Sequence, residues 1–198
     1  AAFSEGGYGA NAEAAAPAQP SSRPKATNED PGLEETLGSV PALRPQLIQD
    51  VSALKGLVQR LMRCTDAGSP VALDTETTDL NPFKAELVGI GVCWGEELDA
   101  LAYIPLAHNG SADSQPIQLP LEDVVTAIAP WLASKDHPKT LQNAKFDRLI
   151  LLRHGLALGG VVMDTLLADY LRDAAAKHGL ELMAEREFGF QPTAYSDL

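Results

Sequence analysis

The chain has 198 residues and a mass of 21.0 kDa, which allows one domain and a tail but is too short for a typical two-domain enzyme. Its content of 45% hydrophobic and 21% charged residues excludes a wholly disordered or collagen-like chain, and no apolar run is long enough for a membrane span. A net charge of −12 argues against a broad basic surface, so any nucleic-acid role must come from a local site.

The first 45 residues have the composition of a linker. They hold 6 of the 14 prolines and show no apolar period of 2 or 3.6. We therefore expect residues 1–45 to be disordered and residues 46–198 to form the folded domain. The chain begins without Met and without a signal-peptide pattern, so we expect a soluble protein that is cut at its front and is not secreted.

The apolar spacing after the linker predicts an α/β domain with a mixed sheet. Asp50 is expected to cap the first helix, and Asn143 is a candidate cap for a later one that stops at Gly155. The elements expected in chain order are a strand at 46–49, a helix at 51–63, three antiparallel strands at 71–76, 87–94 and 101–106, a helix at 121–132, a strand at 140–142, and helices at 143–155, 162–171 and 179–188.

Asp74 and Glu76 are the first candidates for chemistry. One residue separates them on a predicted strand, so their side chains project from the same face. Such a pair is repulsive unless a cation neutralises it, and oxygen ligands without His or Cys favour Mg²⁺ or Mn²⁺ over zinc. The alternative is a pair of ordinary surface acids, because so short a motif often recurs by chance.

The longer strings around these acids resemble a known family. Residues 71–80 read VALDTETTDL and residues 141–151 read LQNAKFDRLIL. Both are similar to the first two motifs of the 3′ to 5′ exonuclease (proofreading) domain of family A DNA polymerase I, within the wider group of four-carboxylate exonucleases that includes ribonuclease D. LAYIPLAH at 101–108 and MDTLLA at 163–168 resemble the same family in order and spacing. The resemblance covers residues 47–188.

This resemblance implies a ribonuclease H-like fold, a mixed sheet flanked by helices, here incomplete at its C-terminal end. It also implies Mg²⁺ or Mn²⁺ as cofactor, with two ions about 4 Å apart that clamp the scissile phosphate. Carried over to this sequence, Asp74 bridges both ions, Glu76 binds the ion that carries the attacking water, and Asp147 holds the second ion. These three are the predicted catalytic and metal-binding residues.

Four further positions match residues that bind the terminal nucleotide in the family. Thr77 and Leu80 follow the first motif, and Leu80 offers an apolar face to a base. A turn hydroxyl and a core leucine are the alternatives for these two. Asn143 and Phe146 are expected at the terminal nucleotide and phosphate, although a helix N-cap and a core aromatic explain them equally well.

Other polar residues are expected to be structural. His108 is more easily a turn or pocket-wall residue than a ligand, because a hard cation prefers oxygen. Asp164 and Asp169 are placed on different sides of the helix expected at 162–171, as structural or solvated groups. Lys145 and Arg148 are candidates for phosphate contact, with surface solvation as the alternative.

The family's third motif, a Tyr followed four residues later by Asp, is not found. The tail has Tyr195 and Asp197 at a spacing of two, so we expect the chain to stop before the motif and to be a weak or inactive nuclease by itself. The resemblance implies a parent DNA polymerase whose polymerase domain follows in the same chain, located in a bacterial cytoplasm, with the nucleoid, or in an organelle matrix. Its expected substrate is a single-stranded or frayed 3′ end of DNA, with no membrane partner.

Two alternatives to the proofreading interpretation stay open. A ribonuclease D-like exoribonuclease shares the carboxylates and differs in its third motif and sugar contacts. A catalytically silent structural module of a polymerase is the other alternative. Asp74, Glu76 and Asp147 argue against it, because a silent domain has no need of three mutually repelling carboxylates.

Overall fold

The computed structural model describes residues 43–110 and 116–189. The predicted linker at 1–45 therefore falls almost wholly outside the described residues, as does the tail with Tyr195 and Asp197. In chain order the elements are β1 (Gln46–Leu47), α1 (Val51–Leu61), β2 (Val71–Thr77), β3 (Leu87–Cys93), β4 (Leu101–Pro105), α2 (Leu121–Ala133), β5 (Lys139–Leu141), α3 (Ala144–Arg153), β6 (Val161–Asp164), α4 (Thr165–Arg172) and α5 (Leu180–Phe188).

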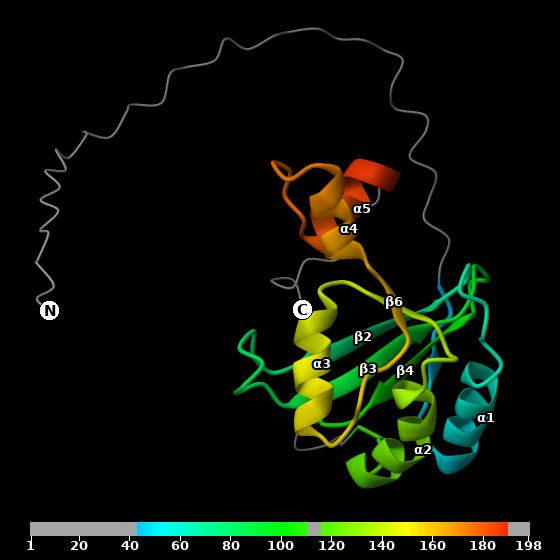
Figure 1. The fold of residues 1–198 in the computed structure, drawn as a ribbon. Helices are drawn as coiled ribbons and strands as arrows, with labels where there is room; N and C mark the ends of the chain where they lie inside the picture. The colour runs from blue at the N-terminus through cyan, green and yellow to red at the C-terminus, as the bar shows by residue number, and fades with distance from the viewer. Residues whose placement is uncertain (1–42, 111–115, 190–198) are drawn as a thin grey trace, which may run out of the picture. The chain divides into compact units, whose positions relative to one another are not determined.

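The six strands form one mixed sheet in the order β1-β4-β3-β2-β5-β6 (Figure 1). β2, β3 and β4 pair antiparallel, which confirms the predicted meander, while β1, β5 and β6 each pair parallel to their neighbours. The α/β prediction with a mixed sheet is therefore confirmed. No helix in the described part of the chain has the length and apolar character that crossing a membrane requires.

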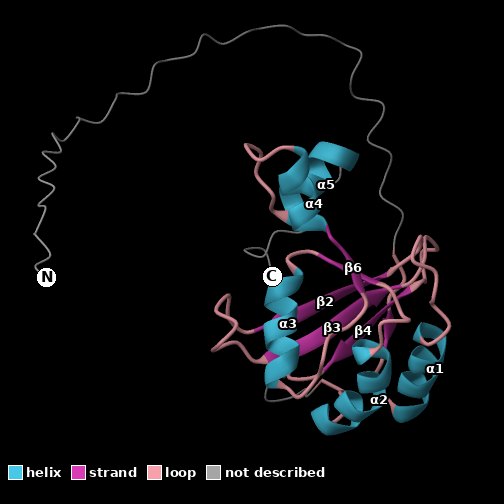
Figure 2. Cartoon of the chain, in the orientation of Figure 1, coloured by secondary structure: helices cyan, strands magenta, loops and turns pink. Residues whose placement is uncertain are grey.

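One face of the sheet packs against helices (Figure 2). The inward residues of β2 alternate with exposed ones, so Val71 and Leu73 enter the core while Asp74 and Glu76 point to the other face. The core continues into the apolar sides of the helices, with Leu54, Leu57 and Leu61 from α1, Val124, Ile128, Trp131 and Leu132 from α2, and Ile150 and Leu151 from α3. Asp50 caps α1 as expected, because its carboxylate accepts a hydrogen bond from the Ala53 amide at 2.8 Å.

A buried lysine closes the connection from α2 to β5. Lys139 is 0% exposed, and its ammonium donates hydrogen bonds to the carbonyls of Trp131, Ser134 and His137. These carbonyls belong to the end of α2 and the turn after it, where a helix leaves acceptors without intrahelical partners. Lys139 thereby fixes the entry of β5, which leads into α3 and the site.

The helix expected at 162–171 is wrong in its first part. Residues 161–164 form the edge strand β6, paired with β5, and α4 begins only at Thr165. Two consecutive valines favour a strand, and the carboxylate of Asp164 then starts α4 by accepting from the amides of Leu166 and Leu167. Asp164 is thus a strand-end residue, not a residue on a helix face.

Two glycines make the close approach between β6 and the end of α2. A Cβ at Gly159 would lie 2.2 Å from the Ala133 carbonyl oxygen, and one at Gly160 would lie 2.5 Å from the His137 carbonyl oxygen. Gly160 also has a φ of +68°, in the left-handed region that disfavours side chains. Only glycine lets the two backbones meet there.

Candidate exonuclease active site

All seven residues predicted for the site line one pocket. It lies between β2 with the loop that follows it and the start of α3, and it has a volume of about 210 Å³. Its predicted members are Asp74, Glu76, Thr77, Leu80, Asn143, Phe146 and Asp147, and the others are Thr75, Asp79 and Gln142. Residues more than sixty positions apart in the sequence therefore meet in one concave place.

Asp147 is the buried acid of this pocket, with 2% of its surface exposed. Its Oδ1 accepts two hydrogen bonds from Thr75, one from the amide at 3.1 Å and one from the hydroxyl at 2.7 Å. Burial raises the pKa of Asp147, and these hydrogen bonds oppose the rise. Both bonds use the same oxygen, so Thr75 fixes the carboxylate without engaging Oδ2.

The pKa of Asp74 depends on the other two carboxylates. Its pKa is raised to about 6, first by desolvation and then by the negative charges of Asp147 and Glu76. Asp74 and Glu76 share the exposed face of β2, whereas Thr75, which holds Asp147, points into the core. The acids therefore approach the end of β2 from both of its faces.

The side chains that line the pocket are of the chemical type that binds a hard divalent cation. They offer carboxylate oxygens whose mutual repulsion a cation would relieve, with no His or Cys among the lining residues. Within 43–110 and 116–189, however, no three His, Cys, Asp or Glu side chains are grouped closely enough to hold a metal ion. The fit is thus one of residue type and charge, and the metal-ligand roles stay a prediction.

The nucleotide-binding candidates surround the acids. Thr77 donates its hydroxyl hydrogen bond to the Asp79 carbonyl at 3.2 Å, and Leu80 is 90% exposed, so the core-leucine alternative for Leu80 is wrong. Phe146 is partly buried against the core and also lines the pocket. Asn143 has a left-handed φ of 60° and makes no side-chain cap, which contradicts the N-cap alternative.

The true cap of α3 comes from β6. Asp164 accepts hydrogen bonds from the amides of Asn143 at 3.1 Å and Ala144 at 2.9 Å. An aspartate from a neighbouring parallel strand thus replaces the local cap, because the left-handed turn at Asn143 carries that side chain away from the helix amides. Asn143 is left with its side chain at the pocket wall.

Sequence reasoning missed three members of the pocket. Thr75 had a signal, since it is a polar residue at an inward strand position and a buried hydroxyl needs a partner. Asp79 and Gln142 adjoin predicted residues but carried no signal of their own. Lys145 and Arg148 are exposed on α3. His108 is also exposed, with its Nε2 2.6 Å from the Tyr103 hydroxyl, and it does not line the pocket.

A larger cavity of about 440 Å³ extends over the exposed face of the sheet. Its lining is mainly apolar and includes Ala72, Cys93, Leu101 and Leu180, with Asp74 as its single carboxylate. All three predicted catalytic acids line the smaller pocket, whereas Asp74 alone of the three lines the larger cavity. We therefore assign the chemistry to that pocket.

Comparison with known proteins adds the family. A family profile described as 3′-5′ exonuclease matches residues 45–198. DNA polymerase I of Synechocystis sp. is 42% identical over 172 residues, which cover 86% of this chain and 17% of that protein. DNA polymerase I of Chloroflexus aurantiacus is 34% identical over 154 residues, which cover 77% of this chain and 15% of that protein. The chain thus spans less than a fifth of the length of these relatives.

Solved structures agree on the fold. The POL domain of Pol1 from M. smegmatis, in complex with DNA primer-template and dNTP, has a TM-score of 0.54 at 23% identity and covers 77% of this chain and 23% of its own. Escherichia coli RNase D has a TM-score of 0.53 at 20% identity and covers 76% of this chain and 35% of its own. The predicted ribonuclease H-like fold is confirmed by these likenesses. From the family profile and the polymerase relatives, the chain belongs to the 3′-5′ exonuclease family and carries a 3′-5′ exonuclease domain of DNA polymerase I.

Proposed function

We propose that this domain removes nucleotides from single-stranded or frayed 3′ ends of DNA, and that it does so as the proofreading part of a longer polymerase. The observation that carries the proposal is that three carboxylates line one pocket together with Thr77, Leu80, Asn143 and Phe146. The polymerase as partner is supported by the small share of the polymerase relatives that this chain covers.

The proposed metal ligands are Asp74, Glu76 and Asp147, with Mg²⁺ or Mn²⁺ as the ions. When bound, such ions neutralise the charge on the phosphate and lower the pKa of water so that it can attack. The protein's own part is to hold Asp147 through Thr75 and to present Asp74 and Glu76 from one face of β2. The raised pKa of Asp74 adds a pH dependence, because protonation below about 6 would remove a ligand.

The nucleotide would lie across the pocket mouth. Leu80, almost fully exposed, offers an apolar side chain to the terminal base, and Phe146 offers an aromatic one from α3. A site of this kind takes an unpaired end, because a paired end must first unstack at a cost of a few kcal/mol. Mismatched 3′ ends should therefore be trimmed faster than matched ones.

The test uses the longer protein that carries this domain. Asp74→Ala should abolish 3′ trimming and leave polymerisation nearly unchanged, since polymerisation is expected to use other carboxylates. Asp136→Ala is the matched control, because Asp136 is an exposed aspartate that does not line the pocket. Full trimming by the Asp74 variant would refute the proposed site, and preference for an RNA over a DNA oligonucleotide would favour the exoribonuclease alternative.

The isolated chain of 198 residues is proposed to trim slowly. Within it, Tyr8, Tyr103 and Tyr170 have no Asp four residues later, and Tyr195 has one only two residues later. A group that aims the water and a fourth carboxylate are therefore not supplied at the expected spacing, and misplacement by about 1 Å already costs much of the rate. Equal trimming by this chain and by the longer protein would contradict this part of the proposal.

A further inference from the structure

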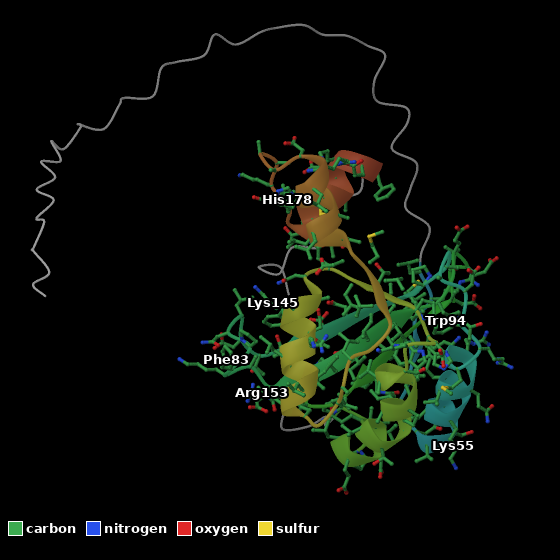
Figure 3. The ribbon with its side chains drawn as sticks, viewed as in Figure 1. Lys55, Phe83, Trp94, Lys145, Arg153 and His178 are labelled. Carbon is green, nitrogen blue, oxygen red and sulfur yellow. The ribbon has the colours of Figure 1, made fainter. Side chains whose placement is uncertain are left out.

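The loop between β2 and β3, residues 78–86, displays two large apolar side chains to solvent. Leu80 is 90% exposed and Phe83 is 73% exposed. Leu80 lines the candidate active site, and Figure 3 shows Phe83 on the same side of the molecule as α3 and Arg153. An exposed leucine binds a ligand in a defined way only if its backbone is held in place, so the anchoring of this loop matters.

The loop has an internal framework of hydrogen bonds. At its base, the Thr78 amide donates to the Glu86 carbonyl at 3.1 Å, and the Glu86 amide donates to the Thr78 hydroxyl at 3.0 Å. At its tip, the Asn81 amide donates to Asp79 Oδ1, and the Phe83 amide donates to Asn81 Oδ1. Leu80 lies between Asp79 and Asn81, so its backbone is part of this hydrogen-bonded framework.

Arg153 attaches the loop to α3. Its Nη1 donates to the carbonyls of Pro82, at 3.1 Å, and Ala85, and its Nη2 donates to Glu86 Oε1 at 3.2 Å. A guanidinium can serve two carbonyls and a carboxylate at once because its donors form a planar fork. His154 Nε2 lies 3.6 Å from the other Glu86 oxygen. The far side of the loop is thus held at the C-terminal end of α3.

The same helix carries the pocket residues Phe146 and Asp147 near its start. Arg153 lies six residues after Asp147, about 9 Å along a rigid helix. Arg153 thus joins the loop that carries Leu80 to the helix that carries Phe146, the two apolar groups proposed to contact the terminal nucleotide.

We propose that Arg153 is a positioning residue for nucleotide binding: by attaching the 78–86 loop to α3 it holds Leu80 in place opposite Phe146. This inference rests on the proposed function of the pocket. Arg153 does not line the pocket, and its hydrogen bonds go to Pro82, Ala85 and Glu86 and not to the three predicted catalytic carboxylates. Its loss should weaken the binding of the 3′ end and leave the hydrolytic groups intact.

The experiment is a double-mutant cycle in the longer protein, with a single-stranded DNA oligonucleotide as substrate. Arg153→Met should raise KM about fivefold and change kcat by less than about twofold, because it removes binding and not transition-state stabilisation. In a Leu80→Ala background, Arg153→Met should have little further effect, within about twofold, since the residue through which it acts is gone. Arg153→Lys keeps a hydrogen-bond donor but not the planar fork, so its KM should lie between that of the unsubstituted protein and that of Arg153→Met.

Arg60→Met is the matched control. Arg60 belongs to α1, and its guanidinium carbon lies 5.4 Å from the centre of the Trp94 ring. Figure 3 places Trp94 on the other side of the molecule from Arg153. This variant should leave KM unchanged. If Arg153→Met does not fold, as judged by its thermal transition, Glu86→Gln replaces it in the cycle and should also raise KM.

The possible outcomes separate the two proposals. The unsubstituted protein could trim 3′ ends while the Arg153→Met and Leu80→Ala substitutions raise KM independently, so that the double variant shows the product of the two effects. That result overturns the positioning role of Arg153 and leaves the proposed function standing. An unchanged KM in the folded Arg153→Met variant, or a fall in kcat with no change in KM, also overturns the positioning role. An unsubstituted protein that trims no 3′ end overturns the proposed function and this inference together.

Discussion

Asp147 and Asp169 are both buried, with 2% and 5% of their surfaces exposed, and their surroundings are opposite. Asp169 is hydrogen-bonded to the His178 ring at 2.7 Å and forms ion pairs with Arg172 and Arg186, and these partners lower its pKa. Among the other residues that the structure describes, only Thr75 donates hydrogen bonds to the Asp147 carboxylate, and the pKa of Asp147 is raised.

The difference shows how a structural acid is told from a functional one. The positive charges beside Asp169 come from Arg172 on α4 and Arg186 on α5, and His178 in the turn between them adds a hydrogen bond, so the carboxylate joins these elements. The neighbours of Asp147 include Asp74, whose own pKa the Asp147 charge raises. A buried acid without a cationic partner is costly to the fold and is retained when it has another use.

The sharpest way to break this comparison is Asp147→Asn in the longer protein. Asparagine keeps an oxygen for Thr75 but removes the charge, so 3′ trimming should fall by at least about a hundredfold. The fold should not be weakened, because the raised pKa shows that the charge opposes folding. Initial rates on a labelled oligonucleotide and a thermal unfolding curve check both parts. Near-normal trimming would show that Asp147 is structural as well.

The reverse change, Asp169→Asn, should affect stability and not chemistry. It leaves Arg172, Arg186 and His178 without their shared anion, so the midpoint of thermal unfolding should fall by several degrees. Trimming per folded molecule should stay within about twofold of the parent. Calorimetry beside an active-site assay measures both, and a large loss of rate in the folded variant would end the distinction between the two acids.

Thr75→Val tests how closely the Asp147 carboxylate must be held. Valine keeps the shape of threonine and the amide hydrogen bond at 3.1 Å but removes the hydroxyl donor at 2.7 Å. We expect kcat to fall about tenfold, because the carboxylate is less well aimed, and the pKa of Asp147 to rise further. The pH–rate profile should shift toward higher pH on its acid limb, and an unshifted profile would contradict this role of Thr75.

The smallest effect concerns Asp74 in the protein without added metal. The pKa of Asp74 is raised to about 6 from 3.8, so the folded state binds a proton more tightly than the unfolded state and loses stability as the pH rises between those values. Asp74→Asn should therefore stabilise the chain at pH 7.5, by about 1 kcal/mol after solvent screening of this exposed group.

Most of that gain should be lost near pH 4, because Asp74, with a pKa of about 6 in the folded protein, is protonated there and its charge no longer opposes folding. Urea unfolding of both proteins at the two pH values measures it. Adding Mg²⁺ should stabilise the parent more than the variant, because a bound cation relieves the same repulsion. Equal curves at pH 7.5 would show that Asp74 carries no such cost.

Much of this could be predicted from the sequence. The alternation in β2 placed Asp74 and Glu76 on one face, and the resemblance of residues 141–151 to the family's second motif placed Asn143, Phe146 and Asp147 at the site. Local pattern was insufficient where a distant residue decides the structure. The cap of α3 comes from Asp164 on β6, and the attachment of the 78–86 loop comes from Arg153. Both depend on a topology that no short window contains.

Gly159 and Gly160 bear on how mutational scans of this domain should be interpreted. A scan that records loss of exonuclease activity will score these two glycines as strictly as Asp147, because any side chain there forces the β6 backbone away from the end of α2. Their intolerance would come from unfolding, whereas that of Asp147 would come from chemistry. A parallel scan that records protein abundance should separate the two classes, with the glycine variants depleted and the Asp147 variants present at normal levels.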